Sequence, residues 1–181
     1  MFARSLLILI AFAVNGIALG SQAVPASRPN NEFSLTLSAS QLTVRGGGPV
    51  VVTVTVTNIS GHVIGVEEDR ASSQEHNYKV TVRGEHGEDA PTTAYHRMLR
   101  GQPSQDDPEI VINSSELLVP LDPGKTLTDS IDLTKLYSLK PGVYSIEVER
   151  TFDNQVIIHS NTLMITVTAG APDPGDSSHP R

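Results

Sequence analysis

The side chains of this 181-residue chain that could carry chemistry are carboxylates and histidines, because the chain contains no cysteine. Some of its 20 Asp and Glu residues lie close together in the sequence, at 67–69, 85–89 and 106–109. Carboxylate oxygens suit Ca²⁺, but none of these groups has the ligand spacing of an EF-hand loop. Runs of charge are usually solvated faces, so we interpret them as loop charge, with an incidental calcium site as the alternative.

The six histidines do not form a metal-binding pattern. No two of them have the short spacing of ligands on one element, although His76, His86 and His96 would meet if neighbouring loops converged. After residue 23 the chain has only Met98 and Met164, whereas exported copper carriers use closely grouped Met and His. We therefore expect surface or turn histidines, and no metal or other cofactor.

Motifs of known enzyme sites are either absent or lack the neighbouring residues and the helix that such a site needs. The Gly-Lys-Thr at 124–126 matches the end of a phosphate-binding loop, but position 119 is Val and a strand pattern follows, which favours a turn. The three glycines at 46–48 precede no helix and are interpreted as a hairpin connection. No Gly-x-Ser-x-Gly elbow occurs. We therefore predict a protein that is not an enzyme, with a triad assembled from distant strands as the alternative.

The first 23 residues have the pattern of a secretory signal peptide. Arg4 supplies a positive charge, residues 6–14 are all apolar, and Ser21 and Ala23 are small residues before a cleavage site. Cleavage after Gly20 is the alternative. The apolar run is far shorter than the about 20 residues that span a bilayer. We predict a secreted or periplasmic protein whose mature chain does not insert into a membrane.

Charge and length limit the partners and the number of domains. The chain has 13 Lys and Arg and a formal charge of −7, which becomes −8 without residues 1–23. Nucleic-acid-binding domains are typically basic, so we exclude a nucleic-acid partner. The rest has the size of one domain. We assign 24–31 to a linker, 32–168 to the domain and the proline-rich 169–181 to a disordered tail.

Apolar residues that alternate with polar ones predict an all-β domain. In 50–57, Val alternates with Val or Thr, a β-branched pattern that fits a half-buried strand. Strands are predicted at 33–38, 50–57, 62–66, 78–83, 116–121, 125–133, 142–150 and 162–168. Seven to nine short strands without a convincing amphipathic helix indicate an antiparallel immunoglobulin-like β-sandwich, here without a disulfide.

One segment sharpens the fold prediction. Tyr144 and Ile146 have the spacing of the corner tyrosine and the second core cysteine of immunoglobulin-type sandwiches, with Ile146 in the place of the cysteine. The hallmark disulfide and tryptophan are both missing. We therefore expect an immunoglobulin-like sandwich that is not of the antibody type.

Four segments resemble secreted bacterial immunoglobulin-like domains of unknown role, and also the accessory domain that precedes the catalytic domain of deuterolysin-like metallopeptidases. They are VTVTVTNIS at 52–60, LDPGK at 121–125, DLTKLYSLKPGVYSI at 132–146 and SNTLMITV at 160–167. The resemblance covers about 32–168 and implies a fold more than an activity. No His-Glu-x-x-His zinc motif occurs, so it implies the accessory domain alone.

Residues 67–109 are the region in which we look for function. They hold ten acids and five bases, and their predicted loops, 67–77 and 84–108, flank a strand. The second loop is unusually long and carries residue types that are common in interfaces. These are Tyr95, His96, Arg97, Met98 and Arg100. We hypothesise that this loop contacts a partner; an insertion without a function is the alternative.

Together these patterns predict a secreted, non-enzymatic binding module for a protein or a cell-surface polymer. The alternative function, suggested by the resemblance, is an inhibitor or accessory partner of an exported peptidase. Asn58 and Asn113 begin N-glycosylation sequons, and the sequence leaves their use open.

Overall fold

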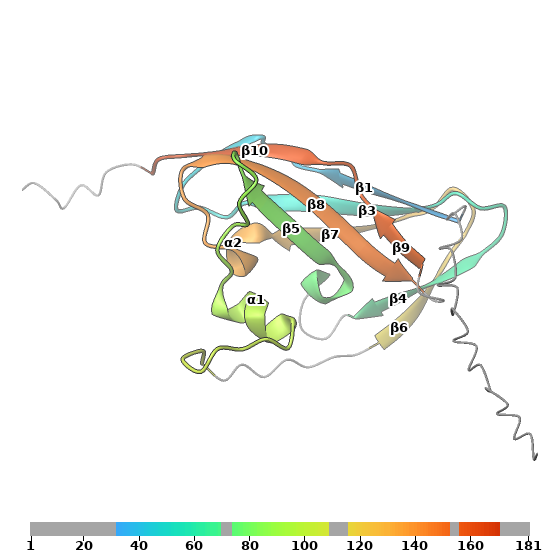
Figure 1. Ribbon diagram of the computed structural model, residues 1–181. Coiled ribbons are helices and arrows are strands. Elements are labelled where there is room, and N and C mark those ends of the chain that lie inside the picture. Colours follow the sequence, from blue (N-terminus) through green and yellow to red (C-terminus); the bar gives the residue numbers. More distant parts are fainter. Residues whose placement is uncertain (1–31, 70–73, 109–115, 153–155, 171–181) are drawn as a thin grey trace, which may run out of the picture.

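The computed structural model describes residues 32–69, 74–108, 116–152 and 156–170 (Figure 1). The predicted signal peptide and linker, and 171–181 of the predicted tail, lie outside the described residues. The strands are β1 Phe33–Ser38, β2 Thr43–Arg45, β3 Val51–Asn58, β4 Ile64–Asp69, β5 Lys79–Gly84, β6 Glu116–Leu121, β7 Thr126–Asp132, β8 Gly142–Phe152, β9 Val156–His159 and β10 Leu163–Thr168. The helices are η1 Gln74–Asn77, a 3₁₀ turn, α1 Ala94–Leu99 and α2 Leu133–Leu136.

The first sheet has the order β1-β3-β7 and is antiparallel. In its central strand, Val52, Val54 and Val56 are completely buried, whereas the intervening threonines are half-buried. Because successive side chains of a strand point to opposite faces, this alternation presents one valine row to the second sheet. The valine pattern of the sequence thus determines which face of β3 is inside.

The second sheet has the order β2-β10-β8-β5, and β9 pairs with the end of β8. The Tyr144 hydroxyl donates to the Lys140 carbonyl (2.9 Å) and accepts from the Lys140 N–H (3.0 Å), which forms the predicted tyrosine corner. Ile146 is completely buried in the position expected of a core cysteine. The described residues therefore fold as an immunoglobulin-like β-sandwich without a disulfide, antiparallel except that the short strand β2 pairs in parallel with β10.

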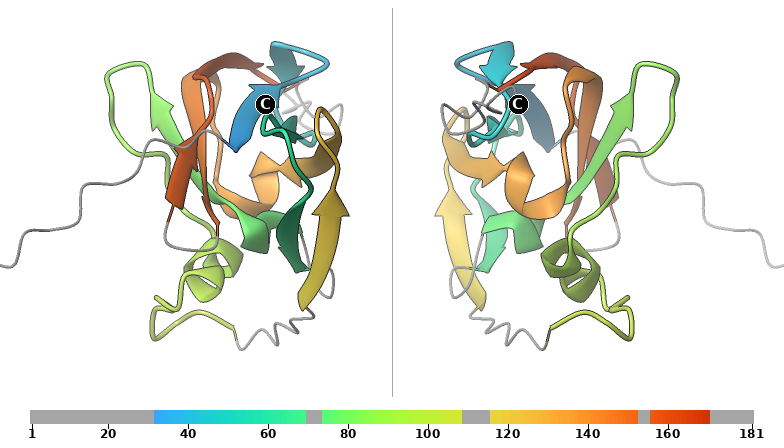
Figure 2. Two further views of the ribbon diagram at one scale, coloured as in Figure 1. Left: turned by 90° about the vertical axis from the view of Figure 1, so that its right-hand side faces the viewer. Right: turned by 90° about the vertical axis from the view of Figure 1, so that its left-hand side faces the viewer.

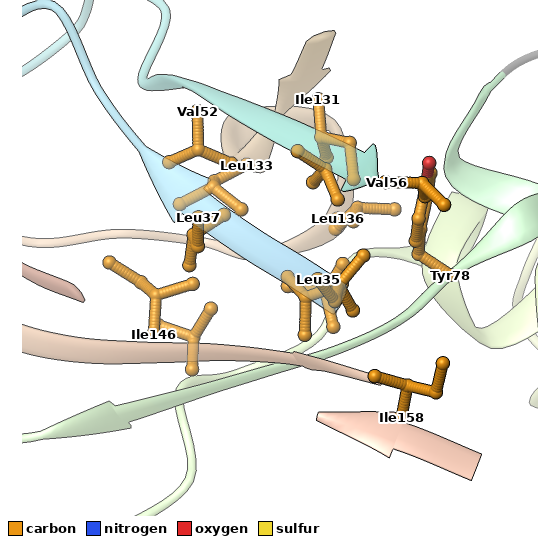
Figure 3. Packing of buried hydrophobic residues seen from close by; sticks show 14 of the residues in the cluster. Leu35, Leu37, Val52, Val56, Tyr78, Ile131, Leu133, Leu136, Ile146 and Ile158 are labelled. Carbon is orange, nitrogen blue, oxygen red and sulfur yellow. The ribbon is translucent and has the colours of Figure 1, made fainter. Parts of the chain in front are cut away.

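The core lies between these two sheets (Figure 3). Leu37 of β1 lies next to Ile146 of β8, and the aliphatic residues of α2 close one side. Burial of each such side chain stabilises the fold by roughly 1.5–3 kcal/mol relative to exposure. With no cysteine in the chain, the sandwich depends on this packing and on hydrogen bonds.

A two-stranded ribbon, β4–β6, extends from the first sheet and lies at the periphery in both views of Figure 2. It continues the β3–β7 pair beyond a bend at Asn58, which is completely buried. The Asn58 amide donates to the carbonyls of His62 (2.8 Å) and Leu121 (2.7 Å), and its backbone N–H donates to Lys125 (3.0 Å). Asn58 therefore connects both strands of the ribbon to the sandwich.

The structure corrects several details of the sequence prediction. Two short strands, β2 and β9, were not predicted, so ten strands are described rather than seven to nine. The glycines at 46–48 join strands of different sheets and do not form a hairpin. The predicted loop at 84–108 contains α1, and the predicted loop at 67–77 contains the end of β4 and η1. Predicted strand ends differ by up to three residues, because tertiary pairing sets them.

Candidate binding site

A groove of about 650 Å³ lies where the ribbon meets the ends of β5 and β8. Its walls come from β4, η1, β5, α1, β6, β8 and β9, which are distant in sequence. The lining residues are Glu67, Glu68, Asp69, His76, Asn77, Tyr78, Lys79, Arg100, Glu116, Glu149, Arg150, Thr151 and Ile157. The groove is therefore a polar, mixed-charge surface and not an apolar pocket.

The floor of the groove is a buried ion pair between Arg150 and Glu68, each about 3% exposed. The Arg150 guanidinium donates to Glu68 Oε1 (2.8 Å), to the Glu67 carbonyl and to the Tyr78 hydroxyl (3.0 Å). Asn77 adds a bond from its amide to Glu68 Oε2 (3.3 Å). These contacts join the ribbon to the second sheet at one point.

The same cluster reaches the first sheet through Tyr78. Its hydroxyl donates to the buried Asp129 carboxylate (2.5 Å) on β7. Burial raises the pKa of Tyr78, and Asp129 raises it further against the opposing effect of Arg150. Tyr78 therefore stays protonated and can act as a donor between the two sheets.

The rim of the groove carries carboxylates. The Glu149 carboxylate bonds to Lys79 (2.5 Å), which lowers the pKa of Glu149. Asp69 lies 3.9 Å from His76 and directly opposite Glu116 across the ribbon. Like charges placed directly opposite each other in a sheet are destabilising, so a cation bound here would relieve this repulsion.

The candidate loop residues fall on or next to α1 (Figure 1). His96 is buried with its ring edge-on to Tyr137 (4.8 Å between centroids), and burial together with Arg100 lowers its pKa. Arg97 forms an ion pair with Asp107, whose pKa it lowers to about 2. Tyr95 and Met98 are half-buried. Most residues of this predicted partner-binding group thus contact other parts of the same molecule, and of the five only Arg100 lines the groove.

The residues around α1 close the outer edge of β5. Three carbonyls along this edge accept hydrogen bonds. The Tyr78 carbonyl accepts one from the Arg100 guanidinium (2.7 Å), and the Val80 carbonyl accepts one from the Tyr137 hydroxyl (2.7 Å). The Val82 carbonyl accepts one from the Ala90 N–H (2.9 Å). Tyr137 is buried, which raises its pKa to about 12. Occupied carbonyls oppose the pairing of another chain with this edge, so Ala90, Arg100 and Tyr137 have a structural role here.

Other sequence motifs have structural positions. Gly124, with φ +72°, turns the chain into β7, which confirms the Gly-Lys-Thr segment as a turn. Asn58 of the first sequon is buried with both amide donor bonds made, so its nitrogen is inaccessible to a glycan in the folded protein, whereas Asn113 lies outside the described residues. Within the described ranges, no group of three or more His, Asp or Glu could hold a metal ion, and no helix is long and apolar enough to cross a membrane.

The interpretation of residues 67–69 as solvated loop charge is wrong for Glu68, which is buried in β4 and paired with Arg150. Arg150 and Asp129 were not predicted as site residues, although the sequence contained a signal for them. Glu68, Asp129 and Arg150 occupy positions in otherwise apolar alternating rows of β4, β7 and β8. A charge in a buried row needs an internal partner. Which residues pair was not predictable, because the pairs join strands more than 50 residues apart.

No protein-family model and no curated protein sequence matches the chain. Among solved structures, a β-glucosidase from Listeria innocua in complex with gluconolactone matches with 16% identity and a TM-score of 0.39, over 77% of this chain and 16% of its own. A β-glucosidase from Erythrobacter marinus matches with 12% identity and a TM-score of 0.37, over 76% and 15%. The chain thus spans about one sixth of the length of these glucosidases.

A further match covers most of both chains. The CARDB domain of a Pyrococcus furiosus protein in complex with di-metal ions has 16% identity and a TM-score of 0.35, over 76% of this chain and 88% of its own. None of the structures named here is a deuterolysin-like metallopeptidase.

Proposed function

We propose that this protein is an exported, non-catalytic binding module that holds a partner protein at the groove beside the β4–β6 ribbon. The observation that carries the proposal is the contrast between the floor and the rim of this groove. The floor charges, Arg150 and Glu68, are buried and paired, so they fix the shape of the site. At the rim, Glu67 and Glu116 are exposed and form no ion pair with another described residue.

The export part of the proposal rests on residues 1–23 and has its own test. N-terminal sequencing of the protein recovered from the periplasm or the medium should begin at Val24, or at Ser21 with the alternative cleavage site. Recovery of a chain that still begins at Met1 in the cytoplasm contradicts export.

The binding part is tested with two double charge reversals of equal net change. Glu67→Lys/Glu116→Lys alters the rim, whereas Glu85→Lys/Asp106→Lys alters two exposed acids outside the groove. Exported proteins from the native host are passed over the parent chain and both variants. We expect the parent and the control to retain the same proteins and the rim variant to lose them. Equal retention by all three contradicts the site.

The resemblance to a peptidase accessory domain makes an exported peptidase one partner class to include. Purified secreted peptidases of the host are assayed with and without the protein, and a change in activity that the rim variant does not produce supports this alternative. Unchanged activities exclude inhibition of those peptidases.

A further inference from the structure

The backbone of β6 directs one row of its polar groups away from the ribbon. In an antiparallel pair, residues alternate between facing the partner strand and facing away, and opposite residues behave alike. On β4 the Asp69 N–H donates to Asn77 Oδ1 (2.9 Å) and the Glu67 carbonyl accepts from Arg150, so both face away from β6. Their opposite residues, Glu116 and Leu118, therefore face away from β4.

This outward row has no partner among the described residues. It consists of the N–H and carbonyl groups of Glu116 and Leu118 and the carbonyl of Pro120. A proline is tolerated in a strand where the missing N–H faces outward, which fits this assignment. By contrast, β1 is closed at Leu37, whose N–H and carbonyl both bond to the Asn161 amide (2.8 and 3.0 Å).

The side chains beside this edge are apolar and acidic. Leu117 and Leu118 are among the exposed large hydrophobic residues, at 48% and 61%. Leu118 lies over Gly65, where a β-carbon would stand 2.8 Å from Leu118 Cδ1, so the missing side chain makes room for the leucine. Glu116 belongs to the same strand, and Glu67 is opposite Leu118. Glu116, Leu118 and Glu67 share one face of the ribbon, whereas Leu117 and Val119 of β6 lie on the other face. An added strand therefore meets carboxylates on one face and only apolar side chains of β6 on the other.

We propose that the outer edge of β6 docks an extended segment of a partner protein in which apolar and cationic residues alternate. The segment adds as a further strand, with backbone bonds to Glu116, Leu118 and Pro120 that supply affinity, while side chains supply specificity. The proposal rests on the proposed function and specifies its binding mode, because Glu116 at the start of this edge also lines the groove. A second copy is disfavoured as the occupant, because each chain carries −7 and the pairing would bring Glu67 and Glu116 of both copies together.

The test uses short capped peptides of alternating Val and Lys, the same peptides with Glu for Lys, and Val-Lys peptides N-methylated on alternate residues. Binding is followed by calorimetry and by amide NMR shifts. We expect the Val-Lys peptide to bind with shifts at Glu116 and Leu118. The Glu peptide and the N-methylated peptide, which has lost its donors on one side, should bind at least about tenfold more weakly. Equal binding of all three overturns the proposal.

Two variants of Leu118 separate the backbone from the side chain. Leu118→Ala keeps the outward N–H, whereas Leu118→Pro removes it without touching a bond to β4. We expect the proline variant to bind about tenfold more weakly than the alanine variant. Equal binding by the two overturns the strand-addition mode. If the proline variant does not fold, the N-methylated peptide makes the same test from the ligand side.

A charge exchange tests the chemistry of the occupant. The Glu67→Lys/Glu116→Lys variant should prefer the Val-Glu peptide, reversing the order seen with the parent chain. An unchanged order overturns the cationic assignment. A dimer in sedimentation velocity that Leu118→Pro abolishes makes the occupant a second copy and also overturns the proposal. If no peptide binds while the rim variant still loses its host proteins, the docking mode fails and the proposed function stands.

Discussion

Two strand edges of this molecule, those of β5 and β6, differ in whether their outward backbone groups have hydrogen-bond partners. The outward carbonyls of β5 accept hydrogen bonds from the guanidinium of Arg100, the hydroxyl of Tyr137 and the backbone N–H of Ala90. The outward groups of β6 have no described partner, and two leucines beside them are exposed. An unprotected apolar edge favours aggregation, so natural proteins usually cover such edges.

The residues that the sequence marked as unusual cover one edge and do not form the open one. The long segment after β5 and its helix α1 protect one edge, although their composition suggested an interface. The buried ion pair of Arg150 and the amide of Asn58 hold the ribbon in place while leaving its outer edge free. We therefore expect variants of the ribbon anchors to lower the free energy of unfolding more than variants of the residues that cover the β5 edge.

The largest effect is expected from the anchor on the groove floor. Arg150→Ala leaves Glu68 buried without its cation, and breaking a buried pair destabilises a protein by about 3–5 kcal/mol. Lys79→Ala, which breaks the exposed pair with Glu149, serves as the control and should cost at most about 1 kcal/mol. The free energy of unfolding in urea measures both. Similar losses in the two variants contradict the anchoring role.

The next effect concerns the bend of the ribbon. Asn58→Ala removes both amide donor bonds and leaves the Leu121 carbonyl buried without its partner, which should cost about 2–3 kcal/mol. Ser60→Ala is the matched control, since it removes one hydroxyl bond to the same amide and should cost about 1 kcal/mol. If Asn58→Ala is the milder of the two, the bend does not depend on this amide.

A smaller effect is expected from the β5 cover. Tyr137→Phe leaves the Val80 carbonyl without its donor and should cost about 1–2 kcal/mol at neutral pH. The pKa of Tyr137 is raised to about 12, so the folded state keeps its proton where the unfolded state loses it. The contribution of Tyr137 to the free energy of unfolding is therefore fully present below pH 10 and is lost as the pH rises toward 12.

Urea titrations from pH 8 to 12 measure this fall. The raised pKa of Tyr78 acts in the same direction, so Tyr137→Phe should reduce the fall without abolishing it. Identical pH profiles for the parent and the variant contradict the rise in the pKa of Tyr137 on burial.

The smallest effect is expected from Arg97→Ala, which releases the partly exposed pair with Asp107 beside α1. Because Arg97 lowers the pKa of Asp107 to about 2, its contribution is present at neutral pH and is lost as the pH falls from 4 toward 2. The urea midpoints of parent and variant should differ slightly at pH 6 and converge at pH 2. A difference that grows with acid contradicts the assignment.

The sequence predicted the sandwich because its strands alternate strictly, as in β3, and because Tyr144 marks a corner that needs only local contacts. It did not predict α1, although Thr93 caps this helix through a bond to the His96 N–H (3.1 Å), because a single turn and a half has little periodicity. The ribbon and the residues that anchor it could not be predicted from the sequence, for a different reason. Arg150 and Glu68 are 82 residues apart, and only the packed sheets bring them together.

Amide hydrogen exchange at two edge residues distinguishes a closed β5 edge from an open β6 edge. The Gly84 N–H of β5 donates to the Glu88 carbonyl (2.8 Å), whereas the Leu118 N–H of β6 faces outward without a described partner. We expect the Gly84 amide to exchange at least about 100-fold more slowly than the Leu118 amide, and the Val-Lys peptide to slow exchange at Leu118 but not at Gly84. Equal protection of the two amides in the free protein would contradict the distinction between a closed and an open edge.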